Sequence, residues 1–349
     1  MSTAAFVTLV LQGSLALLVF AVGLKATPAD TLFLPRHAGL FARSLLSMNV
    51  IMPLLALLVA VVFSLRREVE LALIAMAISP MPPFLPLKTA KAGGTASYTV
   101  SLLVTESLLA IVLVPFTMWF FGRLFGASLY VSPLVIARIV VIGMLVPVLA
   151  GIIVRRVSAS FADRIAKPVD MVAIVFLFAG ALPLLVKLWR PMALLVGNGT
   201  LLAIVALVLA GLAIGHVLGG PEPSHRPVLA LATATRHPAV AIAALKAAFP
   251  NETHAPAAVL LALITAAVAS VPYVKWSPPR SSSKRSAGVG RSRSRRAATR
   301  AVRLSGSAHA CAMVALARRA HFGGLVAVPA SARGTNAGET LPMQPVGGA

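Results

Sequence analysis

Cysteine and acidic residues are scarce in this sequence of 349 residues. Its single cysteine, Cys311, excludes a disulfide or a cysteine-based metal site within one chain. Aspartate and glutamate together number nine, against 31 lysine and arginine residues. Each acidic residue can therefore be considered individually.

Charged residues of both signs make up only 11% of the chain, whereas 58% is hydrophobic and the mean hydropathy is +0.92. A soluble domain cannot bury so large an apolar fraction. The composition therefore predicts an all-α, polytopic integral membrane protein surrounded by the lipid bilayer.

Sequence motifs of common enzyme classes are also missing. There is no Gly/Lys nucleotide-binding motif, no His-Glu-x-x-His and no Gly-x-Ser-x-Gly, and the histidines are scattered. We expect no enzyme, no metal site of this kind and no organic cofactor. An acid–base pair of Glu106 and His237 is the one catalytic alternative that stays open.

Long apolar segments divide residues 1–275 into about nine transmembrane helices. The expected ranges are 4–24, 39–64, 70–90, 97–122, 131–154, 168–189, 192–218, 227–249 and 255–274. The first segment has no basic n-region and runs for about 20 residues, which favours a retained helix over a signal peptide.

The distribution of lysine and arginine predicts the orientation in the membrane. With the N-terminus outside, cytoplasmic loops and helix ends carry ten of these residues and the outer side carries six. We expect an N-out, C-in protein of a bacterial-type inner or plasma membrane. Lys167 and Asp170 are expected to pair at the membrane interface.

Residues 276–349 differ sharply in composition. They are rich in Ser, Arg and Ala, lack apolar periodicity, and with Lys275 hold 13 basic residues but one acid, Glu339. We expect a disordered tail, either a solvated extension or an out-of-frame continuation of a GC-rich gene. Contact with anionic lipid is an alternative, and no nucleic-acid partner is expected.

Two interruptions divide apolar segments of helix length. The first, within residues 79–94, contains four prolines that remove backbone donors: Pro80, Pro82, Pro83 and Pro86. The second is Thr-Ala-Thr-Arg-His-Pro at residues 233–238. Broken helices are tolerated in a bilayer only beside protein or a water-filled cavity, and paired breaks indicate a transporter's central site.

Hydroxyl groups at the breaks are candidate ion ligands. Ser79, Thr233 and Thr235, with backbone carbonyls near Pro80 and Pro82, supply oxygen atoms for a weak sodium site. Alternatively, these hydroxyls satisfy backbone groups that the breaks leave unpaired.

Charged and amide side chains inside apolar segments are further candidates. Glu106 follows Thr105 in the middle of a helix, where a lone carboxylate indicates a functional site. It is expected to bind a cation or carry a coupling proton, or else to be hydrogen-bonded or ion-paired between helices. Asn49, four residues before Pro53, either lines the cavity or bonds to a neighbouring helix.

Arg236, His237 and Pro238 form the second break. Arg236 has three interpretations, namely a bidentate contact with an anionic substrate, a buried ion pair with Glu106, or an extension to the membrane surface. His237 is a candidate for titration in the physiological range.

The order of several short motifs resembles the bile acid:sodium symporter family. These are Phe-Ala-Val-Gly-Leu-Lys-Ala-Thr-Pro-Ala-Asp at residues 20–30, Met-Pro-Leu-Leu-Ala-Leu-Leu at 52–58 and Val-Pro-Tyr-Val-Lys-Trp at 271–276. The resemblance covers about residues 4–275. It implies inverted repeats with two discontinuous crossing helices, here the third and eighth. It also implies a panel domain of the first, fifth and sixth helices that moves against a core domain of the others.

The same resemblance implies inward transport of a small organic anion coupled to sodium. At the first crossing, however, the family's Pro-Gly-Gly-Thr-Ala-Ser-Asn is replaced by Ser-Pro-Met-Pro-Pro-Phe-Leu-Pro at residues 79–86. At the second, the family's Glu and Gln-Asn are replaced by Thr233 and by His237 and Pro238, so the sodium-ligand carboxylate is missing. We expect a secondary transporter coupled to sodium or to protons, with a non-transporting sensor or scaffold as the alternative.

Overall fold

A computed structural model describes residues 3–124 and 131–277, and all regular secondary structure in these two ranges is helical. Of the expected tail at residues 276–349, residues 278–349 lie outside the described residues. Eight helical stretches are long and apolar enough to cross a membrane: Phe6–Lys25, Ala38–Phe63, Ala96–Arg123, Pro133–Val157, Ala159–Leu195, Thr200–Leu218, Arg226–Ala248 and Ala255–Trp276. The chain is therefore an all-α, multi-pass membrane protein, as its composition predicts.

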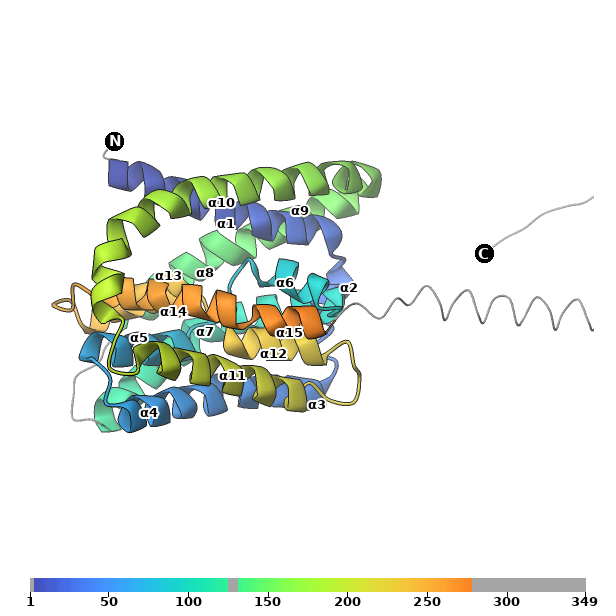
Figure 1. The fold of residues 1–349 in the computed structure, drawn as a ribbon. Helices are drawn as coiled ribbons and strands as arrows, with labels where there is room; N and C mark the ends of the chain where they lie inside the picture. The colour runs from blue at the N-terminus through green and yellow to red at the C-terminus, as the bar shows by residue number, and fades with distance from the viewer. Residues whose placement is uncertain (1–2, 125–130, 278–349) are drawn as a thin grey trace, which may run out of the picture. The chain divides into compact units, whose positions relative to one another are not determined.

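Three helices pack together along one side of the bundle (Figure 1). They are α1 (Thr3–Lys25), α9 (Val146–Val157) and α10 (Ala159–Leu195). α8 (Pro133–Val140) and the π-helix η2 (Val141–Leu145) lead into α9. We call α1, α8, η2, α9 and α10 the panel group, because they occupy the segments that the resemblance assigns to the panel.

The panel group depends on glycine for the close approach of α1 to α9. A Cβ atom on Gly23 would lie 2.2 Å from the carbonyl oxygen of Val148, and one on Gly151 would lie 2.4 Å from that of Phe20. Only residues without a side chain allow the two backbones this separation.

The remaining helices form a second group, which we call the core group. Its continuous elements are α3 (Ala38–Leu45), the π-helix η1 (Leu46–Ile51), α4 (Met52–Phe63), α7 (Ala96–Leu124), α11 (Thr200–Leu218), α14 (Ala255–Ala269) and α15 (Val271–Trp276). The short helix α2 (Pro28–Thr31) connects α1 to this group.

Two segments of the core group are broken. α5 (Arg67–Ile78) and α6 (Leu85–Lys91) flank the first break, and α12 (Arg226–Ala234) and α13 (Pro238–Ala248) flank the second. The expected helix at 70–90 is therefore two pieces of 12 and 7 residues, neither long enough to span a bilayer alone.

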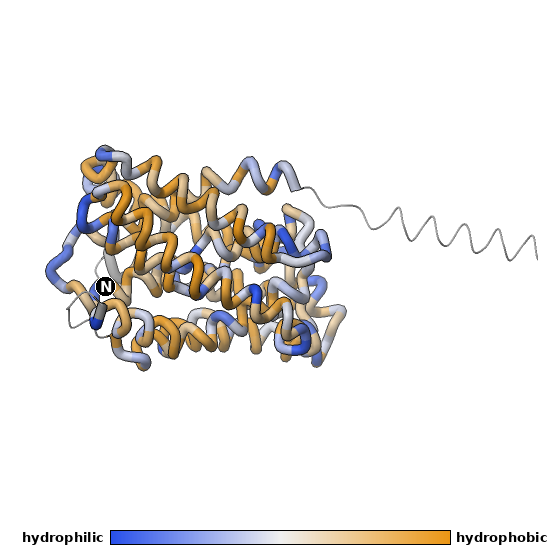
Figure 2. Tube along the Cα trace, turned by 90° about the horizontal axis from the view of Figure 1, so that it is seen from below, coloured by the Kyte–Doolittle hydropathy of each residue, from blue (hydrophilic) through white to orange (hydrophobic). Residues whose placement is uncertain are grey.

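Apolar residues cover the helices, and hydrophilic residues gather towards the two ends of the bundle (Figure 2). Large apolar side chains also face outward. Phe178 and Val186 on α10, for example, are each 70% exposed. Such exposure is expected of side chains that contact lipid.

Helix α10 differs from its expected range of 168–189, because it continues through three prolines, Pro168, Pro183 and Pro191. Neighbouring helices in a membrane allow an internal proline without ending the helix. The expected partnership of Lys167 with Asp170 is wrong, since Asp170 pairs with Lys25 of α1 instead.

Candidate functional site

The two helix breaks meet inside the core group. The backbone N–H of His237, in the second break, donates a 2.8 Å hydrogen bond to the carbonyl oxygen of Pro80 in the first. Residues 79–83 and 235–237 are all buried. We call this contact and its surroundings the junction.

Arg236 links the junction to a third element, the π-helix η1. Its Nη1 donates a 3.0 Å hydrogen bond to the carbonyl oxygen of Ser79, and its Nη2 donates to the carbonyl oxygen of Met48 in η1. The side chain is 2% exposed, and its Nε–H has no hydrogen-bond partner within the described ranges. The guanidinium thus links η1 to the first break.

Prolines leave the carbonyls of Met48 and Ser79 without a backbone N–H partner, so both can accept from Arg236. In η1 the N–H of Met52 donates to the carbonyl of Ser47, five residues earlier. The same register would pair Met48 with residue 53, but that residue is Pro53 and has no N–H. Helical pairing of Ser79 would likewise require an N–H at position 83, which is also proline. The sequence therefore creates the acceptors that Arg236 uses.

Glu106 is buried on α7 near the junction, with 2% of its surface exposed. Asn49 of η1 donates a 3.0 Å hydrogen bond from Nδ2 to Glu106 Oε1. Asn49 was expected either to line a cavity or to bond to a neighbouring helix, and the structure shows the hydrogen bond to α7. None of the ion pairs among the described residues joins Glu106 directly to Arg236, so the expected ion pair is not formed in this conformation.

The three candidate hydroxyl groups have separate partners. Ser79 Oγ donates to the carbonyl of Ala75 at 2.7 Å, and Thr235 Oγ1 donates to the carbonyl of Leu231. Both bonds remain within the helix that ends at the break. Thr233 instead shares a 2.8 Å hydrogen bond with Ser47 of η1, so it joins α12 to the third element.

The other candidates have supporting positions. Pro82 accepts a 3.1 Å hydrogen bond from the N–H of Leu85, at the start of α6. Pro83 is buried in the break, and Pro238 is the first residue of α13, where its missing N–H causes no loss. Thr105 is half-buried beside Glu106. No cluster of three or more His, Cys, Asp or Glu residues suitable for a metal occurs in the searched ranges.

Sequence reasoning missed Ser47 and Met48, the residues of η1 that meet α12 and Arg236. Neither residue type is unusual in a membrane helix. The available signal was Pro53, because a proline inside a helix frees carbonyls in the preceding turn.

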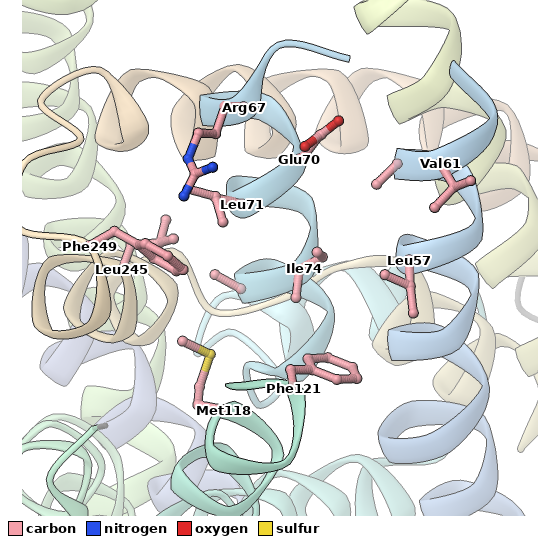
Figure 3. A pocket seen from close by; sticks show the side chains of 12 residues that line it. Leu57, Val61, Arg67, Glu70, Leu71, Ile74, Met118, Phe121, Leu245 and Phe249 are labelled. Carbon is pink, nitrogen blue, oxygen red and sulfur yellow. The ribbon is translucent and has the colours of Figure 1, made fainter. Parts of the chain in front are cut away.

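Two cavities lie in the core group. The larger has a volume of about 350 Å³ and lies between α4, α5, α7 and α13. Figure 3 shows Arg67 and Glu70 at one end of it and Met118 and Phe121 at the other. None of the candidate site residues lines it. A second cavity of about 30 Å³ adjoins Arg236 and is otherwise apolar, so it has room for water but not for an organic anion.

Comparison with known proteins assigns the family. The family model described as the sodium bile acid symporter family matches residues 14–188, half of the chain. This match contains η1, the first break and Glu106, whereas the second break lies beyond it. No curated protein matches the chain. From the extent of the family match, the chain belongs to the sodium bile acid symporter family.

Proposed function

We propose that this protein is a secondary transporter that moves a small organic anion across the membrane. The observation that carries the proposal is the junction, where two broken helices meet and the charged side chains of Arg236 and Glu106 are buried inside apolar segments. Charged groups in membrane segments are costly, and they persist where they serve a substrate or ion pathway. Family membership supports the same function.

Transport in this proposal requires the panel group to move relative to the core group. The 30 Å³ cavity beside Arg236 is too small for the substrate, so in this proposal an anion site at the junction opens during that movement. Arg236 donates to two backbone carbonyls in the described conformation. We therefore assign it to the junction, where its positive charge favours an anion nearby without direct contact.

Glu106 is the proposed carrier of a coupling proton. It is the one acidic residue that is buried in the described ranges, and a 3.0 Å hydrogen bond from Asn49 holds its carboxylate in position.

The distribution of lysine and arginine supports an N-out orientation. The cytoplasmic ends of the helices are then at the α2, α6 and α15 end of the bundle (Figure 1).

Uptake into proteoliposomes tests this function. Labelled aliphatic, aromatic and steroid carboxylates would be offered with and without an inward pH gradient. We expect saturable uptake of at least one class, reduced about tenfold or more by Glu106→Gln and by Arg236→Ala, equivalent to about 1.4 kcal/mol. Arg123→Ala, at the exposed end of α7 and outside the lining of both cavities, is the control and should retain uptake. Unchanged uptake in both site variants would contradict the assignment.

A sensor or scaffold of the same fold is the second candidate. It is favoured by the tight closure of the junction, where carbonyls of the protein itself satisfy Arg236. This function predicts neither uptake of any offered anion nor an anion-dependent change in the melting temperature.

A further inference from the structure

Three backbone carbonyls converge on residues 236 and 237. Those of Met48 and Ser79 accept from the Arg236 guanidinium, and that of Pro80 accepts from the backbone N–H of His237. Carbonyls freed by broken helices are the oxygen ligands that a sodium ion takes inside a membrane protein. Here each of the three already has a hydrogen-bond donor from the second break.

The local charges also oppose a bound sodium ion. The junction contains one fixed positive charge, on Arg236, and the one buried acid of the described ranges is Glu106. When Glu106 is ionised the two charges cancel, and a sodium ion would add an uncompensated positive charge to a buried, low-dielectric region. When Glu106 is protonated, the junction is already positive.

The residues at the junction therefore do not fit a sodium ion, although the family implies one. The resemblance places Thr233 where the family has a glutamate, and the hydroxyl of Thr233 is hydrogen-bonded to Ser47 at 2.8 Å. The oxygen atoms that a cation would need at these positions thus already have hydrogen-bond partners, and none of them carries a negative charge.

We propose that the guanidinium of Arg236 takes the place of a bound cation at the junction, so that the protein neither binds nor requires sodium there. The arginine supplies the positive charge that stabilises the carbonyls of Met48 and Ser79, and it cannot dissociate. A transport cycle built on this junction draws no energy from a sodium gradient. This last consequence depends on the proposed transport function, whereas the absence of sodium binding does not.

The melting temperature of the purified wild-type protein in detergent tests the proposal directly. Measured in NaCl and in KCl at equal ionic strength, it should be the same in both, because a ligand that does not bind the folded state cannot stabilise it. A saturable increase with sodium and not with potassium would overturn the proposal.

Two double variants show whether the junction takes sodium once Arg236 is removed and a carboxylate is introduced. Thr233→Glu with Arg236→Met restores the carboxylate and removes the resident cation, and it should gain a sodium-specific increase of several degrees in melting temperature. Thr233→Gln with Arg236→Met has the same shape without the charge and should not respond. If the Glu variant folds but ignores sodium, Arg236 does not exclude the ion. If it fails to fold, the wild-type comparison decides alone.

Uptake separates this inference from the proposed function. If an organic anion is carried, the rate should be unchanged when sodium is replaced by potassium, and a sodium-dependent rate would overturn the inference. If no anion is carried and sodium leaves the melting temperature unchanged, the transport proposal fails while the inference stands.

Discussion

Asn49 donates its 3.0 Å hydrogen bond to Glu106 from the same turn of η1 whose Met48 carbonyl accepts from Arg236. The π-helical turn therefore lies between the buried acid and the buried base and holds both. Its wider register releases the Met48 carbonyl, and the next side chain reaches α7. A local irregularity of one helix thus connects three elements of the core group.

Glu106 and Arg236 should be energetically coupled although they do not touch. A double-mutant cycle of Glu106→Gln and Arg236→Met, followed by denaturant unfolding in micelles, is expected to give a coupling free energy of about 0.5–3 kcal/mol. Removal of either charge leaves the other uncompensated in the core. The exposed pair of Arg67 and Glu252, 3.1 Å apart, is the control and should give less than about 1 kcal/mol. If the losses of stability from the two buried substitutions simply add, Glu106 and Arg236 do not interact through η1.

The hydrogen bond between Ser47 and Thr233 should make single substitutions worse than a double one. Ser47→Ala leaves the buried Thr233 hydroxyl without its partner and is expected to lower the free energy of unfolding by about 1–3 kcal/mol. Adding Thr233→Val removes the unpaired hydroxyl and should recover much of that loss. A double variant less stable than Ser47→Ala would indicate that the threonine has another essential partner.

The sequence was sufficient to predict the first helix break, because the clustered prolines at 80, 82, 83 and 86 remove several neighbouring backbone donors at once, whereas the separated prolines of α10 leave its helix continuous. It was also sufficient to single out Glu106 and Arg236, since charges are rare in apolar segments. Their partners were harder to predict. Arg236 binds two carbonyls, and backbone groups are present at every position, so no residue type marks them in advance.

Tertiary contacts were predicted least well. Lys167 was the nearest base along the helix to Asp170, yet Lys25 of α1 is the residue that pairs with it. The choice depends on how closely α1 packs against α10, which sequence spacing does not specify. The register of η1 is a similar case, because Pro53 allows several ways to rearrange the preceding turn.

Close packing of α1 on α9 should make Gly151 intolerant of substitution. Gly151→Ala places a Cβ atom 2.4 Å from the carbonyl oxygen of Phe20, so the two backbones must move apart. We expect the variant to lose about 1–3 kcal/mol of unfolding free energy, as in other overpacked sites. Gly13→Ala, on α1 with no atom within 4 Å of the new Cβ, is the control and should be neutral or stabilising by up to about 1 kcal/mol. Equal losses in both variants would rule out helix contact as the cause.

Asp30 should make stability depend on pH at the end of the bundle outside the spanning helices. Partial burial raises the pKa of Asp30, but hydrogen bonds from Ser97 and Thr27 and the charge of Arg155 outweigh it, so the pKa lies below its ordinary value of 3.8. At a pH above 3.8 both states are ionised and the folded state has the benefit of these bonds. As the pH falls through 3.8 towards the folded-state pKa, the unfolded chain binds the proton first and the stabilisation is lost.

Asp30→Asn should therefore be less stable than the wild type at pH 7, by about 1 kcal/mol, because a charged acceptor is replaced by a neutral one. The difference should shrink as the pH is lowered from about 5 to 3, where the wild type loses its own advantage. Ser97→Ala keeps the carboxylate of Asp30 but removes one of its hydrogen-bond donors. At pH 7 its stability should therefore lie between those of the wild type and Asp30→Asn. Melting temperatures recorded across this range provide the measurement. A difference that stays constant with pH would mean that Asp30 acts through its shape, and that the Thr27 and Ser97 hydrogen bonds do not depend on its charge.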